Sequence, residues 1–315
     1  MFPTPELAVQ ILEAVIGPDR WAASRFPTGT SHFVFDAASV HGERLVVRIS
    51  SVAQTAVAAN AVRLTQLLRP LGVPLPDVIH ADVSLARFPY PYVILERLRG
   101  VDLGDIYLDL TAGQKQAIAR EMVRISAIVR ALPPGHGFGF GADHDDPTLR
   151  PTWRRVVEEL VERAEDRFPV GDRTLAGATS RVRSAIAAAS ETLASIEPRP
   201  FLHDTTTKNV MVHAGRVSGI VDVDDFCFGD RLFTPGLTWA SLLARGWPAD
   251  YVDPCWTGAL ALDSSAKQRL RLYAACFCID LLGELGQTFG DRLVPTNDLI
   301  RARLLEAVST LLGER

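Results

Sequence analysis

Two segments in the second half of the chain, FLHDTTTKNVMV and GIVDVDDFCFGD, constrain its fold most strongly. After Asp204 and Asn209 the sequence becomes apolar over residues 210–212, and an Ala214-Gly215 pair separates this run from a second one at 217–223. Two apolar runs joined by so short a turn predict a β-hairpin. The far end of such a hairpin returns Asp222 to the side of Asn209.

The side chains gathered at this end of the hairpin have complementary chemistry. Asp204 is a carboxylate that can accept a hydroxyl proton, whereas the amide oxygen of Asn209 and the carboxylate of Asp222 are hard oxygen ligands of the kind that Mg²⁺ prefers. Because Mg²⁺ keeps waters and nucleotide phosphates in its other positions, two protein ligands are sufficient. The set is typical of Mg²⁺-dependent phosphoryl transfer, with Asp204 as the catalytic base.

Other interpretations of these residues remain open at the level of sequence. A D-x-x-x-x-N match arises by chance in many chains, and a single Asn often serves as a turn residue. Asp224 and Asp225 either line a substrate cleft or cap a backbone turn, and His203 points either into the core or toward the cleft. A hydrolase with Asp222 and Asp224 as paired carboxylates is disfavoured, because we expect the two acids to alternate across a strand and to face opposite sides.

The two segments resemble the catalytic loop and the metal loop of the aminoglycoside phosphotransferase family, relatives of the protein kinases that phosphorylate hydroxyls of small molecules. Upstream features occur in the same order, so the resemblance covers about residues 20–245: a Gly-containing turn at 27–31, the strand LVVRIS, a helix ending at GVPLP, the strand YVILERL and then Gly100. The resemblance implies Asp204 as base, Asn209 and Asp222 as Mg²⁺ ligands, and Asp230 as a structural acid.

The expected fold class is α+β, a bilobal protein-kinase-like fold with a small antiparallel-sheet N-terminal lobe and a large, mostly helical C-terminal lobe. We place the nucleotide-binding lobe at residues 1–99 and the catalytic and substrate-binding lobe at 100–315. Strands are expected within 21–49 and near 77–87 and 92–97. Helices are expected near 6–16, 55–68, 112–131, 151–166, 175–195, 234–244, 264–286 and 296–312. The glycine-rich run at 135–141 is expected to be a surface loop.

The N-terminal lobe departs from the family pattern at its basic residue. The only lysines are Lys115, Lys208 and Lys267, so Arg48 of the apolar strand takes the place of the phosphate-binding lysine. The acid that normally holds this residue is missing from the following helix, where Asn60 stands instead, and its amide oxygen would accept from the guanidinium. The departure leaves a nucleotide-binding pseudokinase or regulatory protein as the alternative function.

Further residues are predicted to bind the phosphoryl donor, ATP or GTP. The amides around Gly29, Thr30 and Ser31 would cover phosphates, although a plain hairpin turn also explains them. Extended main chain at Glu96 and Leu98 would contact the purine edge. Lys208 either reaches a phosphate or is a solvated loop residue.

Acidic side chains in the second lobe suggest a cationic hydroxylated acceptor, such as an aminoglycoside or an aminated macrolide. The candidates are Asp224, Asp225, Asp280 and Glu284. Asp280 lies within an apolar run, so it should meet an arginine, a helix cap or the ligand.

Composition fits a globular enzyme, with 47% hydrophobic and 22% charged residues. A net charge of −4 provides no basic surface for nucleic acid, and Asp280 and Glu284 interrupt the longest apolar run, which argues against a membrane span. We expect no signal peptide, since MFPTPELAVQ lacks a basic start. Four cysteines without zinc-ligand spacing indicate thiols in a reducing cytoplasm. The expected assembly is a monomer or homodimer.

Overall fold

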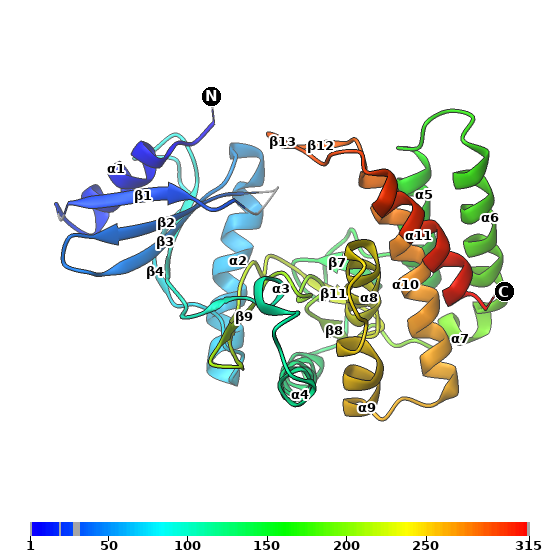
Figure 1. Ribbon diagram of the computed structural model, residues 1–315. Coiled ribbons are helices and arrows are strands. Elements are labelled where there is room, and N and C mark those ends of the chain that lie inside the picture. The colour runs from blue at the N-terminus through cyan, green and yellow to red at the C-terminus, as the bar shows by residue number, and fades with distance from the viewer. Residues whose placement is uncertain (1, 19, 28–31, 314–315) are drawn as a thin grey trace.

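The computed structural model describes residues 2–18, 20–27 and 32–313. Figure 1 shows a sheet-containing lobe at the N-terminal end and a larger helical lobe that holds the C-terminus. The predicted bilobal α+β architecture is therefore confirmed. No helix within the described residues is both long and apolar enough to cross a membrane.

The N-terminal lobe is built on a five-stranded antiparallel sheet with the order β1-β2-β3-β5-β4. Its strands are β1 (Trp21–Arg25), β2 (Phe33–Ser39), β3 (Arg44–Ile49), β4 (Val78–Asp82) and β5 (Tyr92–Glu96). Alternate residues of β2 point inward, among them Phe33 and Phe35, because side chains alternate across a strand. They pack against Ile11 and Leu12 of helix α1 (Pro5–Val15), which covers one face of the sheet.

Helix α2 (Thr55–Leu68) connects the two lobes. Leu64 and Leu68 on this helix belong to the larger apolar cluster of the C-terminal lobe, and Figure 1 shows the helix standing between the lobes. A short 3₁₀ turn precedes it and another follows it, at Val52–Gln54 and Arg69–Leu71. The division of the chain after residue 99 stays a prediction, since the packing of α2 crosses it.

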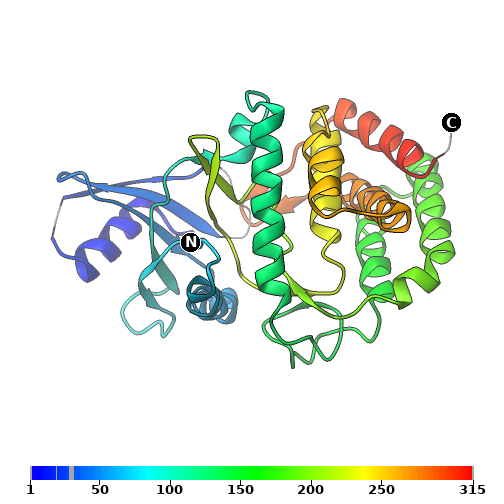
Figure 2. The same ribbon diagram turned by 90° about the horizontal axis from the view of Figure 1, so that it is seen from below.

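The C-terminal lobe is assembled around helix α10 (Ser264–Glu284), which is buried along most of its length. A helix that is apolar on all sides belongs in the centre of a core, and α10 packs against α5, α8 and α11. The remaining helices are α3 (Leu103–Ile106), α4 (Ala112–Arg130), α5 (Trp153–Glu165), α6 (Arg173–Ala188), α7 (Ser190–Ala194), α8 (Phe233–Arg245), the π-helical segment η3 (Tyr251–Trp256), α9 (Thr257–Ala259) and α11 (Asp298–Leu311). Figure 2 shows α4 running along the side of this lobe that faces the N-terminal lobe.

Small sheets in the C-terminal lobe support the loops that carry the functional residues. One has the order β10-β9-β6 and another β7-β11-β8, and β12 pairs with β13. The strands are β6 (Val101–Asp102), β7 (Gly139–Gly141), β8 (Pro200–Phe201), β9 (Val210–His213), β10 (Arg216–Ile220), β11 (Phe226–Phe228), β12 (Thr288–Phe289) and β13 (Arg292–Leu293).

The predicted elements are found, with four corrections. The glycine-rich run is not wholly a loop, because Gly139–Gly141 forms β7 and pairs with β11. The helix expected at 175–195 is divided into α6 and α7, and β4 ends at Asp82, short of the predicted 87. The β12–β13 hairpin was not anticipated. The predicted phosphate-covering turn at Gly29, Thr30 and Ser31 lies outside the described residues.

Candidate active site

The hairpin of β9 and β10 brings the two predicted metal ligands together. The Val221 N–H donates to the Asn209 carbonyl at 3.0 Å, which sets Asp222 beside Asn209. Both residues have left-handed backbones, with φ of 71° at Asn209 and 62° at Asp222. Such conformations cost about 1 to 3 kcal/mol each and cluster at functional sites.

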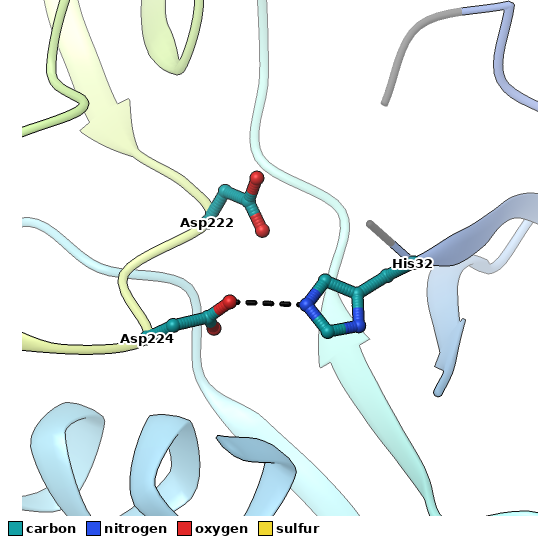
Figure 3. A group of neighbouring side chains, drawn as sticks. All are labelled: His32, Asp222 and Asp224. Atoms are coloured by element: carbon teal, nitrogen blue, oxygen red, sulfur yellow. Dashed lines mark hydrogen bonds and ion pairs between the residues drawn. The ribbon is translucent and has the colours of Figure 1, made fainter. Parts of the chain in front are cut away.

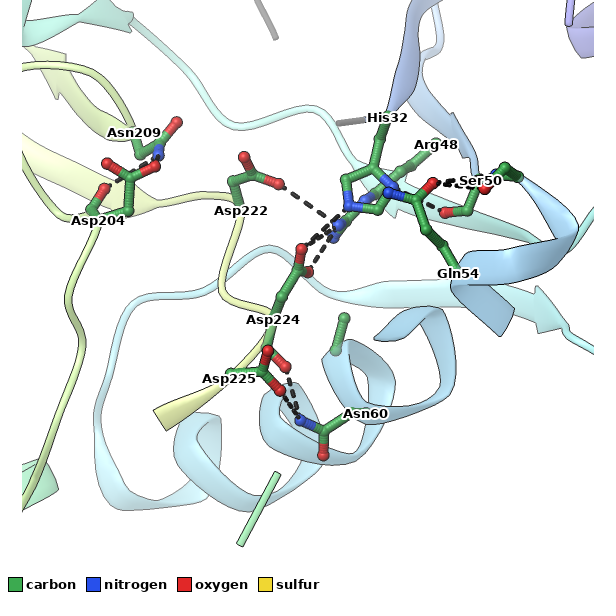
Figure 4. Close-up of polar contacts among 12 residues, drawn as sticks. His32, Arg48, Ser50, Gln54, Asn60, Asp204, Asn209, Asp222, Asp224 and Asp225 are labelled. Carbon is green, nitrogen blue, oxygen red and sulfur yellow. Dashed lines mark hydrogen bonds and ion pairs between the residues drawn. The ribbon is translucent and has the colours of Figure 1, made fainter. Parts of the chain in front are cut away.

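Asp222 does not lie in a strand, contrary to expectation. Strand β10 ends at Ile220, and residues 221–225 are irregular. Asp222 and Asp224 therefore do not lie in a strand, and in a strand two residues at this spacing would share one face. Both approach the same guanidinium, that of Arg48 (Figure 4), so the prediction that the two acids face opposite sides is wrong.

Asn209 is held in a fixed orientation. Its Nδ2 donates to the Asp204 backbone carbonyl at 2.9 Å and to Asp204 Oδ2 at 3.0 Å, as Figure 4 shows. Its backbone N–H donates to Asp102 Oδ1 at 3.1 Å. The amide oxygen, which is the predicted Mg²⁺ ligand, accepts no hydrogen bond from the described residues. A neutral oxygen acceptor left unpaired beside a carboxylate fits a hard cation such as Mg²⁺.

Asp204 opens into the cleft and is exposed there. Desolvation by the surrounding protein raises the pKa of its carboxyl to about 6, the nearby Lys208 opposes this, and Asp222 adds to it. A carboxylate with this pKa is mostly ionised at neutral pH, and it is a stronger base than an ordinary aspartate.

Arg48 is buried at the boundary between the lobes. Its Nη2 lies 2.6 Å from both carboxylate oxygens of Asp224 and 3.4 Å from Asp222 Oδ1. His32 Nε2 lies 3.0 Å from Asp224 Oδ2, and Figure 3 shows this contact beside Asp222. Burial alone would raise the pKa of Asp224, but His32 and Arg48 together hold that pKa below its usual value. The acid that the sequence lacks on α2 is thus supplied by the metal loop.

Asn60 does not support Arg48 as predicted. Its amide oxygen accepts from the Arg63 guanidinium at 3.0 and 2.7 Å. Its Nδ2 donates to the Asp224 backbone carbonyl at 2.6 Å and to Asp225 Oδ1 at 2.9 Å. Asn60 therefore fixes the position of the metal loop, and the loop in turn carries the acid that faces Arg48.

The cluster of His32, Asp222 and Asp224 has its ligand atoms within 4.8 Å of one another. The Arg48 guanidinium already lies among these carboxylates, so its positive charge occupies the space that a cation held by Asp224 would need. Asn209 and Asp222 are the pair that fits Mg²⁺, because neither is saturated by the arginine. The Nε of Arg48 is buried without a hydrogen-bond partner among the described residues, so one donor of the guanidinium is not used by its carboxylate partners.

Some of the backbone groups of Glu96 and Leu98 that were predicted to bind the purine already form hydrogen bonds within the protein. The Glu96 N–H donates to the Asp77 carbonyl at 2.9 Å, and the Leu98 carbonyl accepts from Arg97 Nη1 at 2.9 Å. The Leu98 N–H has no partner within the described part of the chain. Of the Glu96 and Leu98 backbone donors, the Leu98 N–H is therefore the one available to a purine.

A cavity of about 930 Å³ adjoins Asp204. Lys208, Asp280 and Glu284 line it, whereas Asp224 and Asp225 are not among its described walls. The two latter acids were predicted to contact substrate, but they face Arg48, His32 and Asn60 instead. Asp280 meets Arg163 Nη2 at 3.0 Å, which confirms that it pairs with an arginine.

His203 both packs into the core and borders the cavity. Its ring lies 5.1 Å from those of Phe140 and Phe233 and 5.5 Å from that of Phe277, measured between centroids. Burial lowers its pKa to about 3, so the imidazole is neutral at physiological pH. Its Nδ1 has no hydrogen-bond partner among the described residues.

Asp230 has the geometry expected of a structural acid. It accepts from the Leu232 N–H at 3.0 Å, from Arg269 Nε at 3.0 Å and from the Tyr273 hydroxyl at 3.1 Å. These bonds tie the start of α8 to α10.

Asp102 and His32 were not identified from the sequence. Asp102 follows Gly100 by two residues, which is a weak signal for a residue near the lobe crossing. His32 offers none, because its partner Asp224 is 192 residues away along the chain.

Two lobes, with an amide and a carboxylate side by side near a buried basic residue, are the arrangement of a kinase-like phosphotransferase. A model of the phosphotransferase enzyme family matches residues 22–273, and the chain belongs to this family. No curated protein sequence matches the chain.

Solved structures show the same fold. A thermostable mutant of aminoglycoside phosphotransferase APH(4)-Ia in its apo form aligns with a TM-score of 0.71 at 18% identity, covering 96% of this chain and 97% of that one. A ternary complex of such a mutant with AMP-PNP and hygromycin B gives 0.69 at 18% identity, with the same coverage. ADP-bound APH(2'')-Ib gives 0.63 at 13% identity, covering 99% of this chain and 97% of that one. At these identities the likeness establishes the fold.

Proposed function

We propose that this protein is a Mg²⁺-dependent small-molecule kinase, which transfers the γ-phosphoryl group of ATP or GTP to a hydroxyl. The observation that carries the proposal is the convergence of Asp204, Asn209 and Asp222 at the mouth of a cavity, next to a buried arginine. The solved complex of a relative with AMP-PNP and hygromycin B supports a nucleotide donor and a hydroxylated acceptor.

The chain's own residues supply positioning and proton transfer. Asn209 and Asp222 would hold Mg²⁺, which when bound neutralises charge on the phosphates. Arg48 donates to phosphate oxygens through groups that its carboxylate partners leave free. Asp204 orients the acceptor hydroxyl and takes its proton as the bond to phosphorus forms. The cavity walls hold the acceptor in line with the phosphoryl group.

A screen of acceptors tests the proposal. ADP or GDP release is measured by a coupled assay with Mg²⁺ and with EDTA, against a panel of aminoglycosides including hygromycin B, aminated macrolides, amino-alcohols and sugars. We expect acceptor-dependent release that requires Mg²⁺. Release that is insensitive to EDTA would contradict the proposed chemistry.

The pairing of Arg48 with Asp224 favours one second candidate, a nucleotide-binding protein without transfer activity. In that case the guanidinium would stay committed to Asp224, and phosphates would be bound in an unproductive position. Tight nucleotide binding together with no acceptor-dependent release across the whole panel would favour this alternative. The buried free thiols of Cys227, Cys255, Cys276 and Cys278 support a reducing, cytoplasmic setting for either function.

A further inference from the structure

The cavity beside Asp204 carries balanced charge. Its described walls include four basic and four acidic side chains: Arg150, Arg163, Lys208, Arg245, Glu159, Asp204, Asp280 and Glu284. Two of the acids are already paired, because Arg150 Nε lies 2.8 Å from Glu159 and Arg163 Nη2 lies 3.0 Å from Asp280. A polycationic ligand would therefore find few free carboxylates here.

Because Glu159 and Asp280 are already paired with arginines, Glu284 is the acid in the cavity wall that can pair with a substrate amine. It has no ion pair among the described residues, it is partly buried, and burial together with the neighbouring Asp280 raises its pKa. The other unpaired acid, Asp204, faces the acceptor hydroxyl. Two basic groups, Lys208 and Arg245, also face the cavity and oppose the entry of several positive charges.

The rest of the cavity wall is largely apolar. Aromatic and branched side chains from β7, α5, α10 and α11 and from the residue before β7 line it: Phe138, Phe140, Leu160, Phe277, Leu281 and Ile300. Phe140 is 46% exposed, and its ring lies on the cavity wall next to that of His203, so an apolar ligand in the cavity would cover it. The volume lies in the range of pockets that hold drug-sized ligands, and such pockets are lined mostly by apolar side chains.

We infer that the acceptor is a bulky, mainly apolar molecule that carries a hydroxyl and a single basic nitrogen, with the nitrogen paired to Glu284. The inference rests on the proposed kinase function for the role of the hydroxyl. The ion pairs at Glu159 and Asp280 disfavour a polyamine, and the apolar walls disfavour a small polar sugar, because neither would cover Phe140 and its neighbours.

Binding to matched probes tests the inference separately from catalysis. Three hydroxysteroids with zero, one dimethylamino and three amino groups, together with hygromycin B, are titrated into the nucleotide-free protein by calorimetry. We expect the dimethylamino steroid to bind at least tenfold more tightly than the triamino steroid and hygromycin B. Because no nucleotide is present, a failure to transfer phosphate would count against the proposed function and leave this result intact.

Substitutions test the charged contact at Glu284 and the apolar contact at Phe140 separately. Glu284→Gln should bring the affinity for the dimethylamino steroid to within about twofold of that for the uncharged steroid, whereas Phe140→Ser should weaken both. Glu165→Gln on α5 is the matched control, since Glu165 pairs with Arg183 away from the cavity. Tightest binding of the triamino steroid or hygromycin B, no binding of any steroid, or an unchanged charge preference in Glu284→Gln would overturn the inference.

Discussion

At the residue scale, Asn209 and Asp222 both have left-handed backbones, and the Val221–Asn209 hydrogen bond sets their side chains next to each other. Asn and Asp tolerate this conformation better than most residues. Their side chains differ in charge, so they should contribute unequally to metal binding.

We expect Asp222→Ala to abolish Mg²⁺-dependent nucleotide binding and Asn209→Ala to weaken it less, because the second change removes a neutral ligand. The loss in Asn209→Ala includes the support it gives to Asp204 through two hydrogen bonds. Calorimetry with and without Mg²⁺ gives the order of the two effects. If nucleotide binding by Asp222→Ala still depends on Mg²⁺ as it does in the wild type, Asp224 and not Asp222 would be the metal ligand.

Arg48 should be the main phosphate contact of the N-terminal lobe. Arg48→Ala should weaken nucleotide binding by about 1 to 3 kcal/mol, the range for hydrogen bonds to charged groups. Arg44→Ala is the control on the same strand, because Arg44 is exposed and pairs with Asp36. Equal nucleotide affinity in the wild type and Arg48→Ala would mean that another group, with Lys208 the first candidate, holds the phosphates.

At the element scale, α2 holds the metal loop through Asn60. Asn60→Asp keeps the shape of the side chain but replaces the donating amide with a carboxylate facing Asp225 and the Asp224 carbonyl. Buried hydrogen bonds lost in this way cost about 1 to 3 kcal/mol. We therefore expect a turnover at least roughly tenfold lower. The control is Gln66→Glu, which makes an equal charge change on the exposed face of α2, and turnover is measured by steady-state kinetics. A similar loss of turnover in Gln66→Glu would reject the role of Asn60.

Local sequence patterns were sufficient to predict most helices and strands. They could not predict contacts between residues that lie far apart in the chain. Short apolar runs around an Ala-Gly turn were enough to predict the β9–β10 hairpin and the meeting of Asn209 with Asp222. The partner of Arg48 could not be predicted, because Asp224 lies 176 residues away and the docking of the lobes decides the contact. The same holds for Asp280, whose need for an arginine follows from burial but whose partner follows only from the packing of α5 on α10.

At the scale of the whole molecule, the lobes are joined at more than one place. The β12–β13 hairpin extends from the C-terminal lobe toward the N-terminal lobe (Figure 1). There Asp291 Oδ2 lies 2.5 Å from Arg25 Nη1, and Arg292 Nη2 donates to the Phe26 carbonyl at 2.9 Å. These contacts are separate from the bonds that Asn60 makes between the lobes.

We expect Asp291→Ala to speed nucleotide release several-fold while leaving the free energy of unfolding nearly unchanged, because an exposed ion pair contributes little to stability. The pair bridges two lobes, so its loss favours opening more than unfolding. Stopped-flow release of a fluorescent nucleotide measures the rate, and Glu121→Ala, which breaks a pair within α4, is the control. A release rate equal to the wild-type rate would show that the hairpin does not restrain the lobes.

Turnover of Asp204→Asn, measured beside its nucleotide affinity, tests the central claim most directly. The substitution keeps the size of the side chain and removes the group that accepts the hydroxyl proton. Positioned proton transfer contributes about 10² to 10⁴ in rate, so we predict a loss of that order with nucleotide affinity within a few-fold of the wild type. An Asp204→Asn enzyme that turns over at the wild-type rate would contradict the assignment of Asp204 as the base and the mechanism built on it.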